Sequence, residues 1–391
     1  MKRFLNLVTP ALLFCPVLFL TGCGSRNTAV NVERGVIRLE AGDYAAAARA
    51  FSRATRQIQD SAPLFYNLGT AYFQMNRYDA AVSACEAALR IDADFTDASE
   101  LLAQIYIRQQ NFEGAIRQLR PLLRQIANEA RPRILNTLAL AERGAGSPDL
   151  ACLHLNQAMG LNPRYEPTYY NLGELLFTAF QLYPEAIDQF EMYVRRAPAE
   201  EPHVAKAHEL LRKLKASGAT AREAAAADRQ PPRNAAQALR LIAEGDTLYK
   251  GRQWTRAESA YTQALAADPT SYEAAIRLGS ARTAAGNATE AIKAYQRAGE
   301  IAPTRFEPVY LQAYAAYSGR LLDQAEHVLT TLAMPRWPTQ TATYELMAYI
   351  RAAQKRNEEA RIYGEHYLTL APTSAPGIPQ FRTWLDTLPV N

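Results

Sequence analysis

The side chains that most often perform catalysis or bind metals are scattered along this sequence of 391 residues. His203 and His208 are five residues apart, whereas a zinc pair on one helix face is spaced by four. The segment 144–147 contains glycine but lacks the Lys-Ser/Thr pair of a phosphate-binding loop. Neither a Gly-x-Ser-x-Gly motif nor a paired-cysteine metal motif occurs. We therefore expect no catalytic residues, no metal and no cofactor; an enzyme with an unrecognised site is the alternative.

Cys23 is the one residue for which the sequence predicts covalent chemistry. A basic start, Met1–Arg3, precedes an apolar run from Phe4 to Leu20, which is short for a membrane span and typical of a signal peptide. The run ends in Leu20-Thr21-Gly22-Cys23, which resembles a bacterial lipobox. The resemblance implies cleavage before Cys23 and acylation there, and each buried CH₂ of an acyl chain contributes about 0.8 kcal/mol to anchoring. The alternative is an ordinary secretory signal that leaves Cys23 as an odd thiol.

The lipobox resemblance also implies a location. Gly24 rather than aspartate follows Cys23. In lipoproteins of this type, the lack of aspartate at that position implies release to the outer membrane, although this rule differs between bacterial lineages. We expect a lipid-anchored protein of the bacterial cell envelope that faces the periplasm from the outer membrane, with the inner membrane as the alternative.

The rest of the sequence is organised by a repeat of 34 to 36 residues. Nine small residues, which we call anchors, recur at this spacing with one gap of 72: Gly35, Gly69, Ala103, Ala139, Gly173, Gly245, Gly279, Ala313 and Ala348. An alanine follows each anchor by 12 or 13 residues. Around the anchors, apolar residues such as Phe65, Leu68 and Tyr72 fall on one helical face. Helix-turn-helix units of this length stack into solenoids.

The small residues predict how the two helices of a unit pack. Helices approach to about 8–10 Å, and the shortest distances need small side chains at the crossing. A glycine inside a helix costs roughly 1 kcal/mol relative to alanine, so a repeated glycine needs a packing reason. We expect each anchor to face the alanine of the second helix. Aromatic residues such as Tyr78 and Trp254 are expected to cover the turn between the helices.

This pattern resembles the tetratricopeptide repeat (TPR) family. Residues 62–95, 238–271 and 272–305 meet the family's order of Leu-Gly, Tyr, Ala, aromatic, Ala and Pro almost whole. Of the other six units, three are degenerate but in register, two are intermediate, and 166–200 carries a one-residue insertion at Tyr183-Pro184. The resemblance implies an all-α fold, a TPR α-solenoid. It also implies that the first helices line a concave surface that holds other proteins.

The repeats divide the sequence into two arrays. Residues 1–22 are the predicted signal peptide and 23–27 a lipidated tether. Residues 28–216 are assigned to five repeats and a capping helix, and residues 217–234, with the pair Pro231-Pro232, to a linker. Residues 235–374 hold four repeats, and residues 375–391 form a C-terminal cap around Trp384.

The charge of the chain bears on its partner, and its cysteines bear on its core. Once Lys2 and Arg3 leave with the signal peptide, 41 basic residues stand against 39 acidic ones, so no nucleic-acid partner is predicted. Cys85 and Cys152 lie two repeats apart, beyond the Cα separation that a disulfide needs. We interpret both as small core residues.

Counting along the first helices predicts a partner-binding groove. In the first array it comprises Tyr66, Asn67, Thr70, Phe73, Arg108, Asn136, Arg143, Tyr170, Asn171 and Phe177, and in the second Tyr310, Tyr314, Tyr317 and Tyr349. Asparagine can bond both polar groups of a peptide unit, and tyrosine and arginine are favoured in binding hot spots. The alternative is that these aromatics only pack on their neighbours. A carboxylate clamp of the kind some family members use is not predicted, since Asn67 alone matches its positions.

Taken together, the sequence predicts a lipid-anchored scaffold rather than an enzyme. Its partners would be proteins or peptides held in the grooves, and the lipid bilayer through Cys23. Lipoproteins of this type resemble assembly factors for pili, secretins or outer-membrane proteins, which favours assembly of an envelope complex. The alternative is a factor that recruits or regulates peptidoglycan enzymes or contacts the cell wall. The partner's identity and the oligomeric state stay open, as does whether the arrays bind one ligand or two.

Overall fold

The computed structural model describes residues 26–126, 129–227, 234–372 and 374–389, and over these ranges every regular element is helical. The predicted signal peptide, Cys23 and part of the predicted linker lie outside the described residues. The chain divides into two compact units, unit 1 (Met1–Leu214) and unit 2 (Lys215–Asn391). None of the described helices is long and apolar enough to cross a bilayer.

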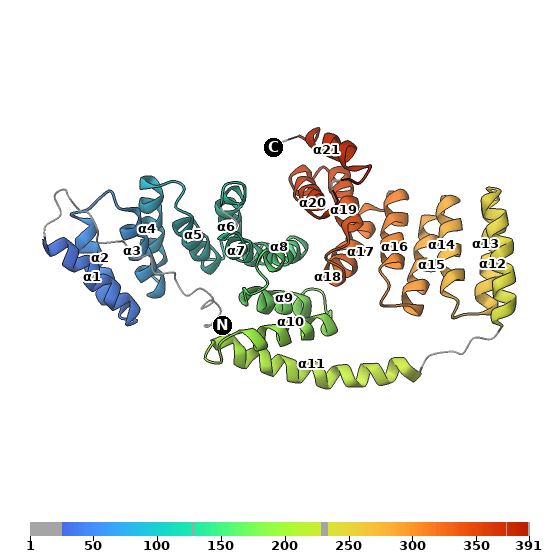
Figure 1. Cartoon of the computed structure of the whole chain (residues 1–391), viewed down its shortest axis with the longest axis horizontal. Helices are drawn as coiled ribbons and strands as arrows, with labels where there is room; N and C mark the ends of the chain where they lie inside the picture. The colour runs from blue at the N-terminus through green and yellow to red at the C-terminus, as the bar shows by residue number, and fades with distance from the viewer. Residues whose placement is uncertain (1–25, 127–128, 228–233, 373, 390–391) are drawn as a thin grey trace. The chain divides into compact units, whose positions relative to one another are not determined.

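Unit 1 consists of antiparallel helix pairs that follow one another along the chain (Figure 1). They are α1 (Arg26–Glu40), α2 (Tyr44–Thr55), α3 (Ala62–Gln74), α4 (Tyr78–Ile91), α5 (Thr96–Arg108), α6 (Phe112–Leu119), the 3₁₀ turn η1 (Pro121–Arg124), α7 (Arg131–Gly144), α8 (Pro148–Leu161), α9 (Pro167–Thr178), α10 (Tyr183–Arg196) and α11 (Pro202–Ala227). The last helix, α11, continues past the end of unit 1, through the first part of the segment predicted as a linker.

Unit 2 has the same arrangement of successive hairpins, with a short final helix. Its elements are α12 (Ala235–Lys250), α13 (Trp254–Ala267), α14 (Tyr272–Ala284), α15 (Ala288–Ile301), α16 (Glu307–Ser318), α17 (Leu322–Val328), the π-helical turn η2 (Leu329–Ala333), α18 (Met334–Arg336), α19 (Thr341–Ala353), α20 (Asn357–Leu370) and α21 (Ile378–Asp386). Each of α12, α14 and α16 contacts both its own partner helix and the hairpin that follows. This all-α solenoid confirms the fold predicted from the repeat.

The hairpins turn in the same way in all nine units. The residue seven or eight positions after each anchor has a positive φ; three of these are glycines (Gly42, Gly146, Gly286) and six are not (Asn76, Gln110, Gln181, Arg252, Arg320, Lys355). Left-handed geometry costs an ordinary L-residue roughly 1–2 kcal/mol. The turn tolerates that cost because it lets the chain leave one helix and begin the next within three or four residues.

The packing of the anchors differs from the sequence prediction. A Cβ built on Gly279 would lie 2.5 Å from Cε1 of Tyr295, and one on Gly245 would lie 2.5 Å from Cε1 of Tyr261. Gly35 and Gly173 meet Phe51 and Phe190 in the same way. At these four units the nearest group to the anchor is therefore an aromatic ring, which lies one helical turn after the expected alanine. At Gly69 the smaller Cys85 takes the ring's place, beside the backbone of Ala81.

The size of the anchor and the size of the second-helix residue that packs against it are complementary. Where the anchor is glycine, the residue sixteen or seventeen positions later is aromatic, or Cys85. Where the anchor is Ala103 or Ala139, the residue sixteen later is leucine, and each pair shares one buried cluster (Leu119 and Leu155). Burying one such apolar side chain contributes roughly 1.5–3 kcal/mol. This pairing is the packing reason for the repeated glycines.

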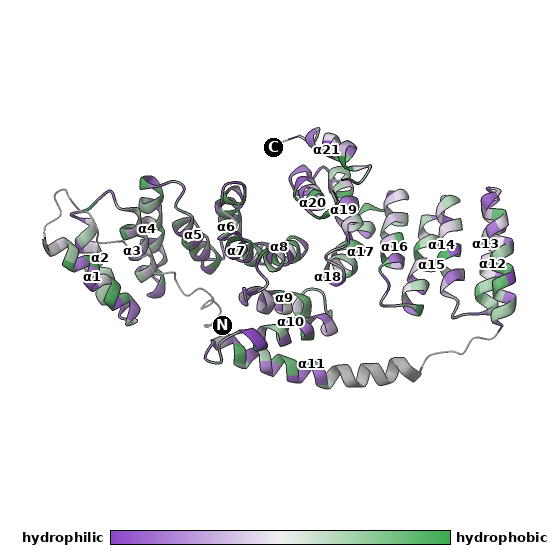
Figure 2. Cartoon of the chain, in the orientation of Figure 1, coloured by the Kyte–Doolittle hydropathy of each residue, from purple (hydrophilic) through white to green (hydrophobic). Residues whose placement is uncertain are grey.

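Hydrophobic and hydrophilic residues alternate around the helices, as amphipathic packing requires (Figure 2). In unit 1 the core ends on α11, where Val204, Ala207, Leu211 and Leu214 join the cluster of α9 and α10. In unit 2 it ends on α21, where Phe381 and Leu385 are buried. Gly364 lets Leu385 approach α20, since a Cβ there would lie 2.6 Å from Cδ1 of Leu385.

Candidate binding surface

The predicted groove residues occupy equivalent places on the first helices. Most lie three residues before, one after or four after an anchor, and we call these places the inner register. In unit 1 the structure buries seven of the ten: Tyr66, Asn67, Thr70, Phe73, Asn136, Tyr170 and Asn171. Arg108, Arg143 and Phe177 are half-buried. In unit 2 the tyrosines are more accessible, with Tyr314 45% exposed and Tyr310, Tyr317 and Tyr349 half-buried.

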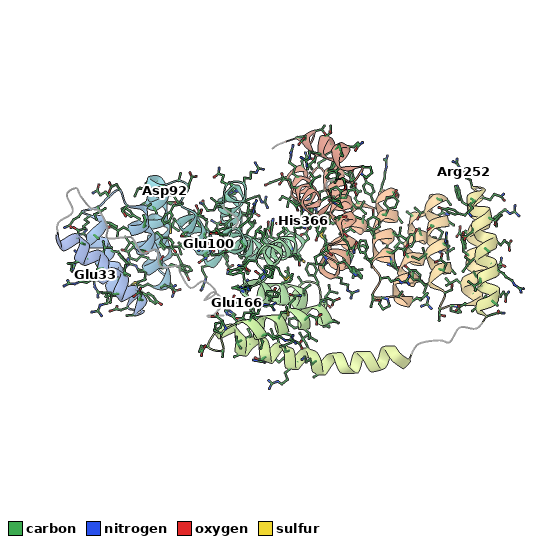
Figure 3. The ribbon with its side chains drawn as sticks, in the orientation of Figure 1. Glu33, Asp92, Glu100, Glu166, Arg252 and His366 are labelled. Carbon is green, nitrogen blue, oxygen red and sulfur yellow. The ribbon has the colours of Figure 1, made fainter. Side chains whose placement is uncertain are left out.

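In α5 and α7 the inner register contains a buried carboxylate with its own cation. Glu100, labelled in Figure 3, is 2% exposed, and its Oε2 lies 2.9 Å from Nε of Arg133. Thr137 Oγ1 donates to Glu100 Oε1 at 3.0 Å, and Gln104 donates to the same oxygen at 3.3 Å. Burial raises the pKa of Glu100, although Arg133 opposes that shift. Arg133 also pairs with Asp97.

A second network joins α7, α9 and α11. Glu174 Oε1 accepts a hydrogen bond from the Tyr170 hydroxyl at 2.8 Å, and Glu174 Oε2 pairs with Arg143 at 3.2 Å. Lys206 of α11 pairs with Glu174, and its Nζ lies 5.6 Å from the centre of the Tyr170 ring. Burial opposes ionisation of Glu174, but the hydrogen bonds from Lys206 and Tyr170 outweigh it and lower its pKa.

The aromatic residues of the inner register in unit 1 pack on the turn aromatics. The Phe73 ring centre lies 6.2 Å from that of Tyr78, and that of Phe177 lies 6.0 Å from that of Tyr183. The Arg108 guanidinium lies 5.6 Å from the centre of the Phe73 ring. These contacts support the packing interpretation for Phe73 and Phe177, and they leave their binding role a prediction.

In unit 2, Asp246 of the inner register accepts a hydrogen bond from the Tyr261 hydroxyl at 2.7 Å and pairs with Arg277 at 3.6 Å, and α16 and α19 present aromatic side chains. The rings of Tyr310 and Tyr314 are nearly parallel, with centres 6.4 Å apart. Tyr310 also lies 5.7 Å from Phe306, which contacts Trp337. On α19, the ring centre of Tyr349 lies 4.4 Å from that of Trp384 in α21. We call Tyr310, Tyr314, Tyr317 and Tyr349 the tyrosine surface.

Sequence reasoning missed Glu345, which lies in the same inner register on α19 as Glu100 does on α5. Glu345 is half-buried, and among the described residues none forms an ion pair or side-chain hydrogen bond with it. Burial raises its pKa. After burial, the charge of Glu345 is the next cause that raises the pKa values of Tyr310, Tyr349 and Tyr367. Its distance of three residues from the anchor Ala348 was the available signal.

His154, His366, Cys85 and Cys152 are buried within the hairpins. His154 Nδ1 lies 2.6 Å from Oε2 of the fully buried Glu142, and His366 packs edge-on against Tyr344. Burial raises the pKa of the thiols of Cys85 and Cys152 to about 12, which keeps both protonated. A shallow hollow beside α17 is lined by Asp323, Glu326 and Gln354, and Gln354 donates to both carboxylates. Within the described residues, no three His, Cys, Asp or Glu side chains cluster as metal ligands.

Comparison with known proteins identifies the repeat. Residues 32–94 and 242–305 match one tetratricopeptide-repeat family model, and residues 73–139 match a second. These matches show that the chain carries tetratricopeptide repeats in both units. They confirm the repeat that the sequence pattern predicted.

Individual proteins match the chain over shorter stretches. The tetratricopeptide repeat and J domain-containing co-chaperone DNJ1 of Cryptococcus neoformans var. grubii is 29% identical over 143 residues, which are 36% of this chain and 27% of that protein. The match thus spans about a quarter of the relative's length. A thermophilic TPR protein of Thermus thermophilus covers 47% of this chain over 98% of its own length, with 18% identity and a TM-score of 0.42. MamA of Desulfovibrio magneticus covers 46% over 99% of its own length, with 17% identity and a TM-score of 0.40.

Proposed function

We propose that this tetratricopeptide-repeat chain is a scaffold that holds a protein partner against the tyrosine surface of unit 2. The observation that carries the proposal is the contrast between the two inner registers. In unit 1 the polar residues of that register bond to one another and most are buried. In unit 2 the same register presents four tyrosines that are partly or largely accessible.

Tyrosine suits this role for physical reasons. Its ring supplies a large contact area and its hydroxyl a polar group, at the cost of ordering only two side-chain torsions. The nearly parallel rings of Tyr310 and Tyr314 already restrain each other. A surface that is ordered before binding loses less entropy when the partner arrives. The partial match to a tetratricopeptide repeat co-chaperone agrees with a protein partner.

Site-specific photocrosslinking in cells tests this proposal. A photoreactive phenylalanine analogue replaces Tyr314, which is 45% exposed; as a matched control it replaces Leu370, which is 38% exposed and lies on α20. We expect a protein adduct from position 314 that is absent from position 370, and mass spectrometry then identifies the partner. No adduct at 314, or the same adducts from both positions, would contradict the proposal.

We propose further that the scaffold is lipid-anchored through Cys23 in the bacterial outer membrane and serves assembly of an envelope complex. The support is the sequence alone: a basic start, an apolar run and Leu20-Thr21-Gly22-Cys23. In bacterial cells given radiolabelled palmitate, the wild-type chain is expected to become labelled and to fractionate with the outer membrane. Cys23→Ser should lose both properties while keeping its helical content. Label on the Cys23→Ser variant, or none on the wild type, would overturn the anchor.

A further inference from the structure

Carboxylates of the inner register in unit 1 each receive a cation from a neighbouring helix. Glu100 of α5 pairs with Arg133 of α7, at 2.9 Å. Glu174 of α9 pairs with Arg143 of α7 and with Lys206 of α11. A carboxylate that has been taken partly out of water is costly to keep charged unless such a partner compensates it. In unit 1 the compensating cation comes from the chain itself.

Glu345 is in the same register of unit 2 and receives no such cation. In unit 1 the helix that follows the hairpin of each of these carboxylates supplies a cation: α7 supplies Arg133 and α11 supplies Lys206. In unit 2 the helix that follows the hairpin is α21, and the side chains that it packs on α19 are the aromatic Phe381 and Trp384. Arg351, on the same helix as Glu345, is 1% exposed and already pairs with Glu326 and Glu359. Within the described parts of the chain, Glu345 has no ion pair, and Tyr349 lies one helical turn after it on α19.

We propose that Glu345, together with Tyr310, Tyr314 and Tyr349, binds a lysine or arginine side chain of the protein partner. This inference rests on the proposed function of the tyrosine surface and specifies the chemistry of the partner. The carboxylate supplies the opposite charge, and the faces of the tyrosine rings attract a cation through their quadrupoles. The ligand's charge takes the place that Arg133 and Lys206 occupy in unit 1.

Unit 1 contains an intramolecular example of a lysine held by a carboxylate and a tyrosine ring. Lys206 Nζ pairs with the carboxylate of Glu174 and lies 5.6 Å from the centre of the Tyr170 ring. Tyr170 and Glu174 are four residues apart on α9, and Glu345 and Tyr349 are four residues apart on α19. The order is reversed, but in both cases one helical turn presents a carboxylate beside a phenol ring. In unit 1 the site holds a lysine of α11, and in unit 2 it is accessible to a lysine of another protein.

The test uses two capped tripeptides as probes, Ala-Lys-Ala and its neutral counterpart Ala-Gln-Ala. Saturation-transfer difference NMR measures their affinities for the purified full chain. Glu345→Gln removes the charge with little change of shape. Glu365→Gln on α20 is the matched control, because it removes the same charge from an exposed side chain of the same unit.

We expect the lysine peptide to bind the wild-type chain about tenfold more tightly than the glutamine peptide, a ratio typical of a combined charge and cation–π contact. Glu345→Gln should abolish the preference, and Glu365→Gln should keep it. Equal affinity for the two peptides, no detectable binding of either, or a preference that survives Glu345→Gln would overturn the inference. The photocrosslinking separates the two proposals: an adduct at position 314 without a lysine preference leaves the scaffold standing and removes only the basic ligand.

Discussion

Asn171 donates a hydrogen bond from its Nδ2 to Oδ1 of Asn136, at 2.9 Å, and so joins α9 to α7. Both side chains are 3% exposed. The sequence suggested that such asparagines would bond to a peptide, which stays a prediction; the structure shows these two bonded to each other. The bond belongs to a row of polar contacts that runs from α5 to α11 and gives the interface between hairpins a defined register.

Asn136→Ala is therefore expected to destabilise the protein. The substitution leaves a buried amide donor on Asn171 without its acceptor, which costs about 1–3 kcal/mol. Urea denaturation followed by circular dichroism measures the change. Replacing both asparagines with alanine should cost less than the sum of the single changes, because neither partner is then left unsatisfied. Full additivity would show that the contact does not couple the two helices.

Two anchor glycines are expected to differ in how strongly they resist substitution. Gly279→Ala forces a Cβ to within 2.5 Å of Tyr295 and should cost about 1–3 kcal/mol through overpacking. Gly69→Ala, whose Cβ would lie 3.0 Å from the smaller Cys85 Sγ, should cost less. Thermal denaturation of the two variants gives the ranking. A larger loss at Gly69 than at Gly279 would refute the ring-packing account.

Gly286→Ala should also destabilise, but through the backbone. Its φ is +80° and no atom lies within 4 Å of an added Cβ, so steric contact contributes nothing. We expect a loss of roughly 1–2 kcal/mol from left-handed geometry. As a control, Lys355→Gly at the equivalent turn relieves the same geometry and should not destabilise. Loss of stability in both variants would mean that some other feature limits these turns.

The carboxylates of Glu174 and Glu345 should affect stability in opposite directions. The folded-state pKa of Glu174 is lowered, so its charge stabilises the fold above the unfolded-state pKa, and this contribution is lost as pH falls through the folded value. Glu174→Gln should cost about 1.5–3 kcal/mol at pH 7, from lost hydrogen bonds to a charged group. The difference from wild type should shrink in acid. Urea titrations at pH 7 and pH 4 test this.

Glu345 has a raised folded-state pKa, so its charge opposes folding at pH 7 and the penalty disappears as pH falls through that value. Glu345→Gln should therefore raise the stability of the isolated chain at pH 7 and have little effect near pH 4. A destabilised variant at pH 7 would show that the carboxylate has a compensating partner in the chain. A charge that lowers the stability of the free chain and attracts a ligand is an example of the trade-off between stability and function at binding sites.

The units are expected to unfold separately. Repeat proteins are stabilised by neighbouring hairpins, so a core defect acts close to its position. Phe381→Ala removes a side chain that is 2% exposed and should destabilise unit 2 by about 3–5 kcal/mol. Hydrogen exchange measured by mass spectrometry should show faster exchange in α16 to α21 and no change in α3 to α9. Faster exchange in both units would mean that they unfold as one.

The sequence predicted the repeat, the helix pairs and the all-α solenoid because small residues at fixed spacing have a local packing cause. It did not predict which inner-register residues would be buried. Tyr170 and Tyr314 looked alike in the sequence, yet Tyr170 is 1% exposed and Tyr314 is 45% exposed. The difference arises because α11 brings His203 and Lys206 against Tyr170, and no described ring or charge apart from Tyr310 packs on Tyr314. How deeply a side chain of one repeat is buried depends on the side chains of the repeat that follows, and the periodicity of the sequence does not show those contacts.

The fit between each glycine and its ring has a consequence for how hairpins can be recombined. Gly245 pairs with Tyr261 and Gly279 with Tyr295, and each pair lies within a single hairpin. The segments 238–271 and 272–305 therefore each contain both members of a glycine–tyrosine pair and can be exchanged as whole hairpins. A chimera cut at the turn would instead join a glycine to a leucine and leave a void, or an alanine to an aromatic ring and create a clash. The hairpin, and not the single helix, is the interchangeable part of this protein.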